Sequence, residues 1–161
     1  MEHILTGVSK TNITPPLGYR LQGHISRAKA STKIHDPLYL KALTIKKEDE
    51  RIAILTFDLL GLSTQFVNLA REDIRKKTGL LPHQVMMCAS HTHSGPFVLP
   101  APDGTMDENF IPEYLPFLVK QTSSAIIEAF NKEVEANMLY GKTEVNIGSI
   151  NRRKINPDGS V

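Results

Sequence analysis

The sequence predicts an α/β fold, in which a mixed sheet contains a βαβ unit and helices pack on the sheet. Two apolar segments, residues 51–58 and 84–90, are nearly continuous runs, as expected for strands covered on both faces. The segment between them, residues 63–79, has the apolar period of an amphipathic helix. Strand, helix and strand in this order indicate a βαβ unit with parallel strands.

The elements before this unit predict further strands and a long loop. Residues 3–10 are expected to form a short strand, and the Pro-Pro and Gly of residues 12–19 end it. Residues 20–36 are polar with few apolar anchors, which indicates a loop. Residues 38–47 alternate as a strand with both faces partly apolar. A charged turn, residues 47–50, then leads into the first apolar run, so a hairpin is expected.

Capping residues and apolar stripes define the two expected helices. Ser63 or Thr64 is suited to cap the first helix, and Gly79 is suited to end it. Its apolar stripe consists of Phe66, Val67, Ala70 and Ile74. A second helix is expected over residues 114–131, and residues 136–150 read as one or two strands. The inner stripe of the second helix is Leu115, Leu118, Thr122, Ala125, Ile126, Ala129 and Phe130.

Composition places the chain among soluble globular proteins. Its 161 residues suffice for one domain with a core, and 40% are hydrophobic while 22% are charged. The net charge of +2 and a single short basic cluster, residues 152–154, argue against a nucleic-acid partner. Cys88 is the only cysteine, which excludes an intrachain disulfide and a cysteine-based zinc knuckle. Met86, Met87 and Cys88 are expected to fill the core.

The two ends of the chain carry expectations about location and completeness. The first residues lack the basic and apolar regions of a secretory signal, and no apolar run approaches the roughly 20 residues of a transmembrane helix. A cytoplasmic location is therefore expected. The chain stops at Val161, in turn chemistry that follows an expected strand. We therefore expect residues 1–161 to form a single α/β domain that is the N-terminal part of a larger catalytic domain.

The motif His-Thr-His-Ser-Gly-Pro follows the second strand of the βαβ unit. Functional groups of open α/β sheets gather at the carboxyl ends of strands. If the chain stays extended, His91 and His93 point the same way and face one crevice. Imidazole is a common metal ligand and acid/base group, and Gly95 and Pro96 favour a turn afterwards. The motif is therefore a ligand pair, a ligand beside an acid/base group, or two ordinary loop histidines.

Other known contexts for His-x-His fit poorly. The metallo-β-lactamase pattern requires Asp and His where Gly95 and Pro96 stand. Amidohydrolase barrels need about 250 residues and place the motif on their first strand. Ser94 lacks the Gly-x-Ser-x-Gly surroundings of a nucleophile elbow.

Outside the motif, Asp58 and the pair His35 and Asp36 each have two interpretations. Asp58 ends the first apolar strand, where it either orients a ligand imidazole or caps the following turn. His35 and Asp36 form either a site pair or a turn before Pro37. His24 lies in a polar loop. Surface positions are expected for the two remaining histidines, His3 and His83.

The chain resembles the N-terminal part of the neutral/alkaline, non-lysosomal ceramidase family. The resemblance rests on five blocks in the family's order, which span nearly the whole chain. The most specific block is "ASHTHSGP", which is similar to the family's His-Thr-His-Ser-Gly-Pro signature. The other blocks are "GVSKTNITPPLG", "KIHDPLYLKALTI", "RIAILTFDLLGLS" and "INRR".

The resemblance implies a zinc-dependent hydrolase of an N-acyl amide bond, such as that of ceramide. It implies that His91 is a zinc ligand, that His93 meets the reacting group, and that Arg152 belongs to the catalytic site. The family's other zinc ligands, a histidine, a glutamate and a tyrosine, and its nucleophilic serine come later than Arg152, so they are expected beyond Val161. The zinc chemistry transfers more readily than the substrate.

Two functions are therefore expected from the sequence. The first is a Zn²⁺-dependent, ceramidase-like amidase of lipid metabolism, incomplete in this chain, that acts on a small sphingolipid-like N-acyl substrate. The second is a non-catalytic α/β binding module that keeps the fold without turnover. Further metal ligands beyond Val161 would favour the enzyme.

Overall fold

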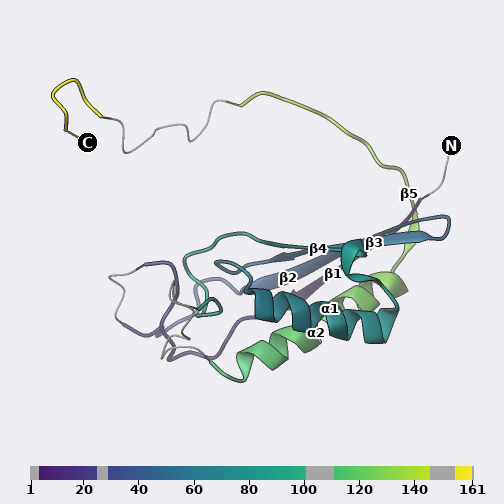
Figure 1. Ribbon diagram of the computed structural model, residues 1–161, viewed down its shortest axis with the longest axis horizontal. Helices are drawn as coiled ribbons and strands as arrows, with labels where there is room; N and C mark the ends of the chain where they lie inside the picture. The colour runs from purple at the N-terminus through teal and green to yellow at the C-terminus, as the bar shows by residue number, and fades with distance from the viewer. Residues whose placement is uncertain (1–3, 25–28, 101–110, 146–154, 161) are drawn as a thin grey trace.

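The computed structural model describes residues 4–24, 29–100, 111–145 and 155–160. Within them, one mixed sheet and two long helices form two layers, and residues after the sheet lead away from both layers (Figure 1). The elements are β1 (Ile4–Asn12), β2 (Tyr39–Lys47), β3 (Glu50–Phe57), α1 (Thr64–Thr78), η1 (Pro82–Gln84), β4 (Val85–Ala89), α2 (Tyr114–Asn131) and β5 (Val134–Ala136). The expected α/β class is confirmed.

The sheet contains the expected hairpin and βαβ unit. Its strand order is β4-β3-β2-β1-β5, and every neighbouring pair is antiparallel except β3 and β4. The parallel pair has a register that runs from Ala53 opposite Val85 to Phe57 opposite Ala89. The helix that joins these two parallel strands is α1, so the carboxyl ends of β3 and β4 lie side by side at the same end of the sheet.

Local signals define the ends of α1 as expected. The hydroxyl of Ser63 accepts a hydrogen bond from the Phe66 amide at 3.2 Å, which satisfies one of the free N–H groups at the helix start. Gly79 ends the helix in the left-handed conformation, with φ of 78°, and its N–H donates to the Arg75 carbonyl. Phe66, Ala70 and Ile74 face the core.

Helix α2 lies unusually close to β1. The hydroxyl of Ser9 donates to the Ala125 carbonyl at 2.8 Å, and a Cβ added to Gly7 would lie 1.8 Å from the Ala129 oxygen. Small residues at these positions therefore let the helix backbone pack directly on the strand. The core between the layers consists mainly of apolar side chains, among them Leu40, Leu55, Phe57, Leu59, Leu118 and Ile126.

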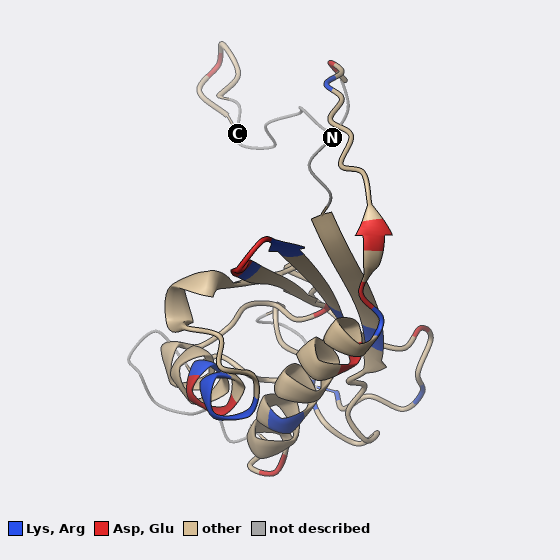
Figure 2. Ribbon diagram, turned by 90° about the vertical axis from the view of Figure 1, so that its right-hand side faces the viewer, with Lys and Arg blue, Asp and Glu red and all other residues tan. Residues whose placement is uncertain are grey.

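The prediction that the buried strands are covered on both faces is wrong for the described residues. Both helices lie on the same side of the sheet (Figure 2). The opposite face carries apolar side chains in solvent, such as Val8, Ile52 and Met86, which is 59% exposed. Met86 is therefore not core filling, contrary to expectation. An apolar run shows that both faces avoid polar residues, whereas the arrangement of the helices decides which face is covered.

The expected strands at residues 136–150 are also not found where they can be checked. β5 covers only Val134–Ala136 at the sheet edge, and residues 137–145 are exposed, with Leu139 at 94%. An alternating pattern becomes a strand only where a neighbouring strand supplies hydrogen bonds, and β1 pairs with three residues of β5. Residues 146–150, like Arg152, lie outside the described part of the chain.

Candidate functional site

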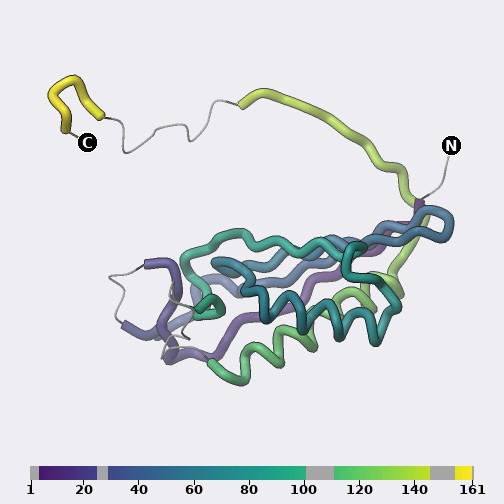
Figure 3. The backbone as a smooth tube through the Cα atoms, viewed as in Figure 1, coloured from purple at the N-terminus to yellow at the C-terminus, as the bar shows by residue number. Residues whose placement is uncertain are grey.

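The histidine motif lies at the end of the sheet where β3 and β4 terminate, as the sequence predicts. The last backbone hydrogen bond between these two strands runs from the Ser90 amide to the Phe57 carbonyl, at 2.9 Å. The loops before β2 and after β4 gather at this same end of the molecule (Figure 3). The motif therefore lies among loops that a rigid sheet positions.

The two imidazoles come together by a different backbone path from the one expected. His91 has φ of 60°, so the chain does not stay extended through the motif. The expected alternation of side chains past β4 is therefore wrong. The ring centroids of His91 and His93 nevertheless lie 5.0 Å apart, with the rings at 76° to each other. The turn, rather than strand geometry, brings the rings edge to face.

A backbone carbonyl determines the tautomer of His91. Its Nδ1 donates a hydrogen bond to the Leu60 oxygen at 2.8 Å, from the loop that follows β3. This contact leaves Nε2 as the basic nitrogen of an exposed ring. Metal-binding histidines usually donate their other ring N–H to a carbonyl or a carboxylate, which fixes the ring orientation. The contacts of His91 thus fit those of a metal ligand.

Asp58 does not orient His91. Its carboxylate accepts a hydrogen bond from the Tyr39 amide at 2.9 Å, and its own amide donates to the Tyr39 carbonyl at 2.9 Å. These two contacts join the end of β3 to the start of β2. Neither interpretation of Asp58 is therefore borne out: its carboxylate bonds to the start of β2, not to a ligand imidazole or to the turn that follows it.

A third histidine, His24, lies next to the motif, although the sequence indicated only that it belongs to a polar loop. The ring centroid of His24 lies 5.0 Å from that of His93, with the rings at 67°. His93 therefore has an imidazole on two sides, His24 and His91. The pattern of residues around His24 contains no periodic signal, so only the contact between two distant loops could reveal it.

His35 and Asp36 form an exposed pair that lines a cleft next to the histidine motif. The imidazole Nδ1 and a carboxylate oxygen lie 2.6 Å apart, and both side chains are over 80% exposed. The cleft, of about 470 Å³, is lined by residues from both loops, among them Thr92 and Ser94 from the histidine motif. Thr92 and Ser94 thus line a cleft that the two motif histidines do not line.

The residues described hold part of a zinc site at most. Within residues 4–24, 29–100, 111–145 and 155–160, no group of three or more His, Cys, Asp or Glu is placed to hold a metal ion. A catalytic zinc usually has three protein ligands. His91 suits one of them, and the others would have to come from elsewhere.

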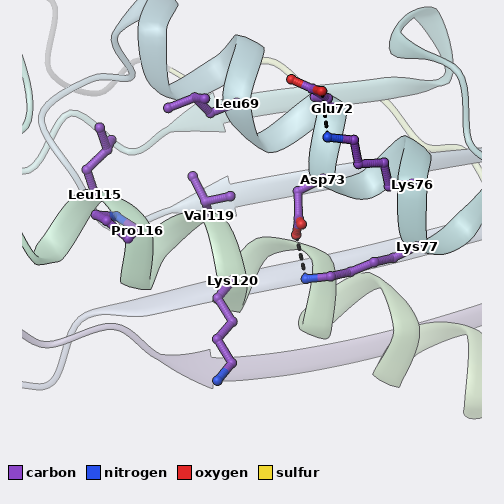
Figure 4. Close-up of a pocket in the computed structure, with 9 residues that line it drawn as sticks. All are labelled: Leu69, Glu72, Asp73, Lys76, Lys77, Leu115, Pro116, Val119 and Lys120. Atoms are coloured by element: carbon purple, nitrogen blue, oxygen red, sulfur yellow. Dashed lines mark hydrogen bonds and ion pairs between the residues drawn. The ribbon is translucent and has the colours of Figure 1, made fainter.

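A second hollow lies on the outer surface between α1 and α2 (Figure 4). It measures about 490 Å³, and two of its lysines form ion pairs, Lys76 with Glu72 at 2.6 Å and Lys77 with Asp73 at 2.7 Å. The residues that line it include none from the histidine loops. We therefore assign this groove no part in the candidate site.

No helix in the described part of the chain is both long and apolar enough to cross a membrane.

No family model matches the sequence, and a search of curated proteins finds no match.

Solved structures do resemble the chain. Neutral ceramidase from Pseudomonas aeruginosa superimposes with a TM-score of 0.67 over 83% of this chain, at 20% sequence identity. A ceramidase complexed with C2 gives a TM-score of 0.63 over the same share, at 19% identity. The chain covers 22% of each of those proteins. It therefore has the fold of one segment of a neutral ceramidase.

Proposed function

We propose that this chain belongs to a ceramidase-like, zinc-dependent hydrolase that cleaves an N-acyl amide bond. The observation that carries the proposal is the hydrogen bond from His91 Nδ1 to the Leu60 carbonyl, because it presets His91 as a ligand through Nε2. The ceramidase-like fold and the His-Thr-His-Ser-Gly-Pro signature support the same function.

The roles of the residues follow from their chemistry. A bound zinc would supply Lewis acidity for an amide carbonyl and for water, and His91 would be one of the residues that hold it. His93 holds or transfers a proton at the reacting group, from a half-buried position beside His91. Arg152, which lies outside the described residues, binds an oxyanion or a polar group of the substrate, since its planar donors suit such groups. Further ligands come from outside the described residues.

The substrate that we propose is a sphingolipid-like N-acyl compound, which would give the protein a role in lipid metabolism. The similarity in fold to two ceramidases supports this proposal. The cleft lined by Thr92 and Ser94 adjoins the histidines and combines apolar and polar side chains, as an amphipathic substrate requires.

The test compares His91→Ala, His93→Ala and Thr92→Ala in the whole protein, including any segment that follows residue 161. Zinc content is measured by mass spectrometry, and hydrolysis is measured with a simple N-acyl substrate. We expect His91→Ala to lose bound zinc and activity. His93→Ala should keep its zinc and lose roughly a hundred- to ten-thousand-fold in rate.

Thr92→Ala is the control for zinc content alone: Thr92 lines the cleft that we propose for the substrate, so this variant should keep its zinc whatever its rate. Full zinc and full activity in His91→Ala would contradict the proposed function. A wild-type protein that binds zinc without hydrolysing N-acyl substrates would instead favour the non-catalytic module.

A further inference from the structure

A short segment before the βαβ unit, residues 21–24, crosses the histidine loop and pairs with it. Leu21 forms an isolated antiparallel bridge with Pro96, and the Gln22 amide donates to the Gly95 carbonyl at 2.9 Å. The two partners, Gly95 and Pro96, are the last residues of the His-Thr-His-Ser-Gly-Pro motif. The segment is therefore attached to the backbone that carries His93.

The side chain of Gln22 strengthens this attachment. Its Nε2 donates to the Leu99 carbonyl at 3.1 Å, and its Oε1 accepts from the Val98 and Leu99 amides at 3.2 and 3.4 Å. One half-buried amide thus uses both of its ends on the backbone that follows the motif. These contacts fix the position of the next residue, Gly23.

Gly23 lies directly against the ring of His93. Its φ is 109°, a conformation that side chains disfavour, and an added Cβ would lie 2.6 Å from Cγ and 2.8 Å from Nδ1 of His93. The glycine backbone therefore occupies the space next to the imidazole. No larger residue fits there unless the ring moves.

His24 lies against another side of the His93 ring. It contacts one side of His93 edge to face, while His91 contacts another, each at a centroid distance of 5.0 Å. The contacts with Gly23, His24 and His91 thus help to restrict an imidazole that lies on a loop.

We propose that residues 21–24 are a strap that positions His93, with Gln22 as its anchor and Gly23 as its contact surface. As a statement about catalysis, this inference rests on the proposed function of His93. These residues act through His93 and are positioning residues. A group held by packed and hydrogen-bonded neighbours reacts efficiently, and a misplacement of about 1 Å costs on the order of a hundredfold in rate.

The decisive variant is Gly23→Ala, and the chain offers a matched control in Gly18→Ala. Both glycines have positive φ, 109° and 95°, but a Cβ on Gly18 would meet nothing within 4 Å. Both variants therefore strain the backbone, while only Gly23→Ala displaces the imidazole. We expect Gly23→Ala to lower kcat about a hundredfold, with KM within about twofold and zinc content unchanged. Gly18→Ala should keep kcat near the wild-type value.

Equal kcat values for the two glycine variants would contradict the proposal that residues 21–24 position His93. If Gly23→Ala fails to fold, Gln22→Ala replaces it, because this variant removes the anchor without adding a clash. We expect Gln22→Ala to lower kcat about tenfold, again at constant KM and zinc content. An unchanged kcat in Gln22→Ala would overturn the strap as well.

A measurement without turnover separates the strap from the proposed function. In the same protein, labelled on histidine, nuclear magnetic resonance should show a through-space contact between the rings of His24 and His93. The His93 ring signals should shift in Gly23→Ala and not in Gly18→Ala. If these results hold while the wild type hydrolyses no N-acyl substrate, the strap stands and the proposed function falls. If hydrolysis is found but the ring contact is absent, the strap falls and the function stands.

Discussion

The sheet with its two helices and the histidine loops hold their residues in different ways. Phe57 at the end of β3 is 0% exposed and packs on Phe66, at a ring distance of 5.6 Å, within a continuous core. His91, which follows the neighbouring strand β4, is exposed, and a single carbonyl sets the orientation of its ring. Many redundant contacts define a core position, whereas a few specific contacts define a position in the loops.

Two glycines show the consequence of this difference. Gly7 leaves no room for a Cβ because the backbone of α2 lies against it, and Gly23 leaves none because the His93 ring does. A side chain at Gly7 would separate two layers of the fold. A side chain at Gly23 would move one imidazole. The need for a glycine therefore concerns stability at position 7, and the geometry of the candidate site at position 23.

The largest effect on stability is expected for Phe57→Ala. Removing this buried ring leaves a cavity beside Phe66, which should lower the free energy of unfolding by about 3–5 kcal/mol. Chemical denaturation of the two proteins measures the difference. Ile52→Ala on the same strand is the control, because Ile52 is on the open face and 43% exposed, and its loss should be clearly smaller. Comparable losses would show that the open face is as well packed as the core.

A moderate effect is expected for Gly7→Ala. The new methyl group would lie 1.8 Å from the Ala129 oxygen, so α2 must shift away from β1. Overpacking of this kind costs about 1–3 kcal/mol of unfolding free energy. Gly141→Ala, where a Cβ meets nothing within 4 Å, is the control for the same measurement. Equal stabilities of the two variants would mean that α2 is not held against β1 as described.

The smallest effect on stability is expected at the histidine loops. In metal-free protein, His91→Ala should change the free energy of unfolding by less than about 0.5 kcal/mol, as exposed substitutions usually do. Thermal unfolding in the presence of a chelator measures this change. A loss as large as that of Gly7→Ala would remove the distinction between the two regions and make His91 a structural residue.

Local patterns in the sequence determined the main helix and strands of the fold. Ser63 and Gly79 set the ends of α1 because capping involves only neighbouring residues. The apolar runs of β3 and β4, with α1 between them, determined a parallel pair and so placed the motif at the edge where both strands end. The position of the motif could therefore be predicted from the sequence.

Only the tertiary structure decided how the histidines are oriented and which residues surround them. The left-handed turn at His91, the carbonyl of Leu60 and the approach of His24 all depend on how loops fold back on one another. The hydrogen bond from Gln22 to Leu99 joins residues 77 positions apart, and no periodicity or capping rule reaches that far. The same reason explains why the open face of the sheet and the early end of β5 escaped prediction: an apolar pattern records what a segment can bury, and the surrounding chain decides what covers it.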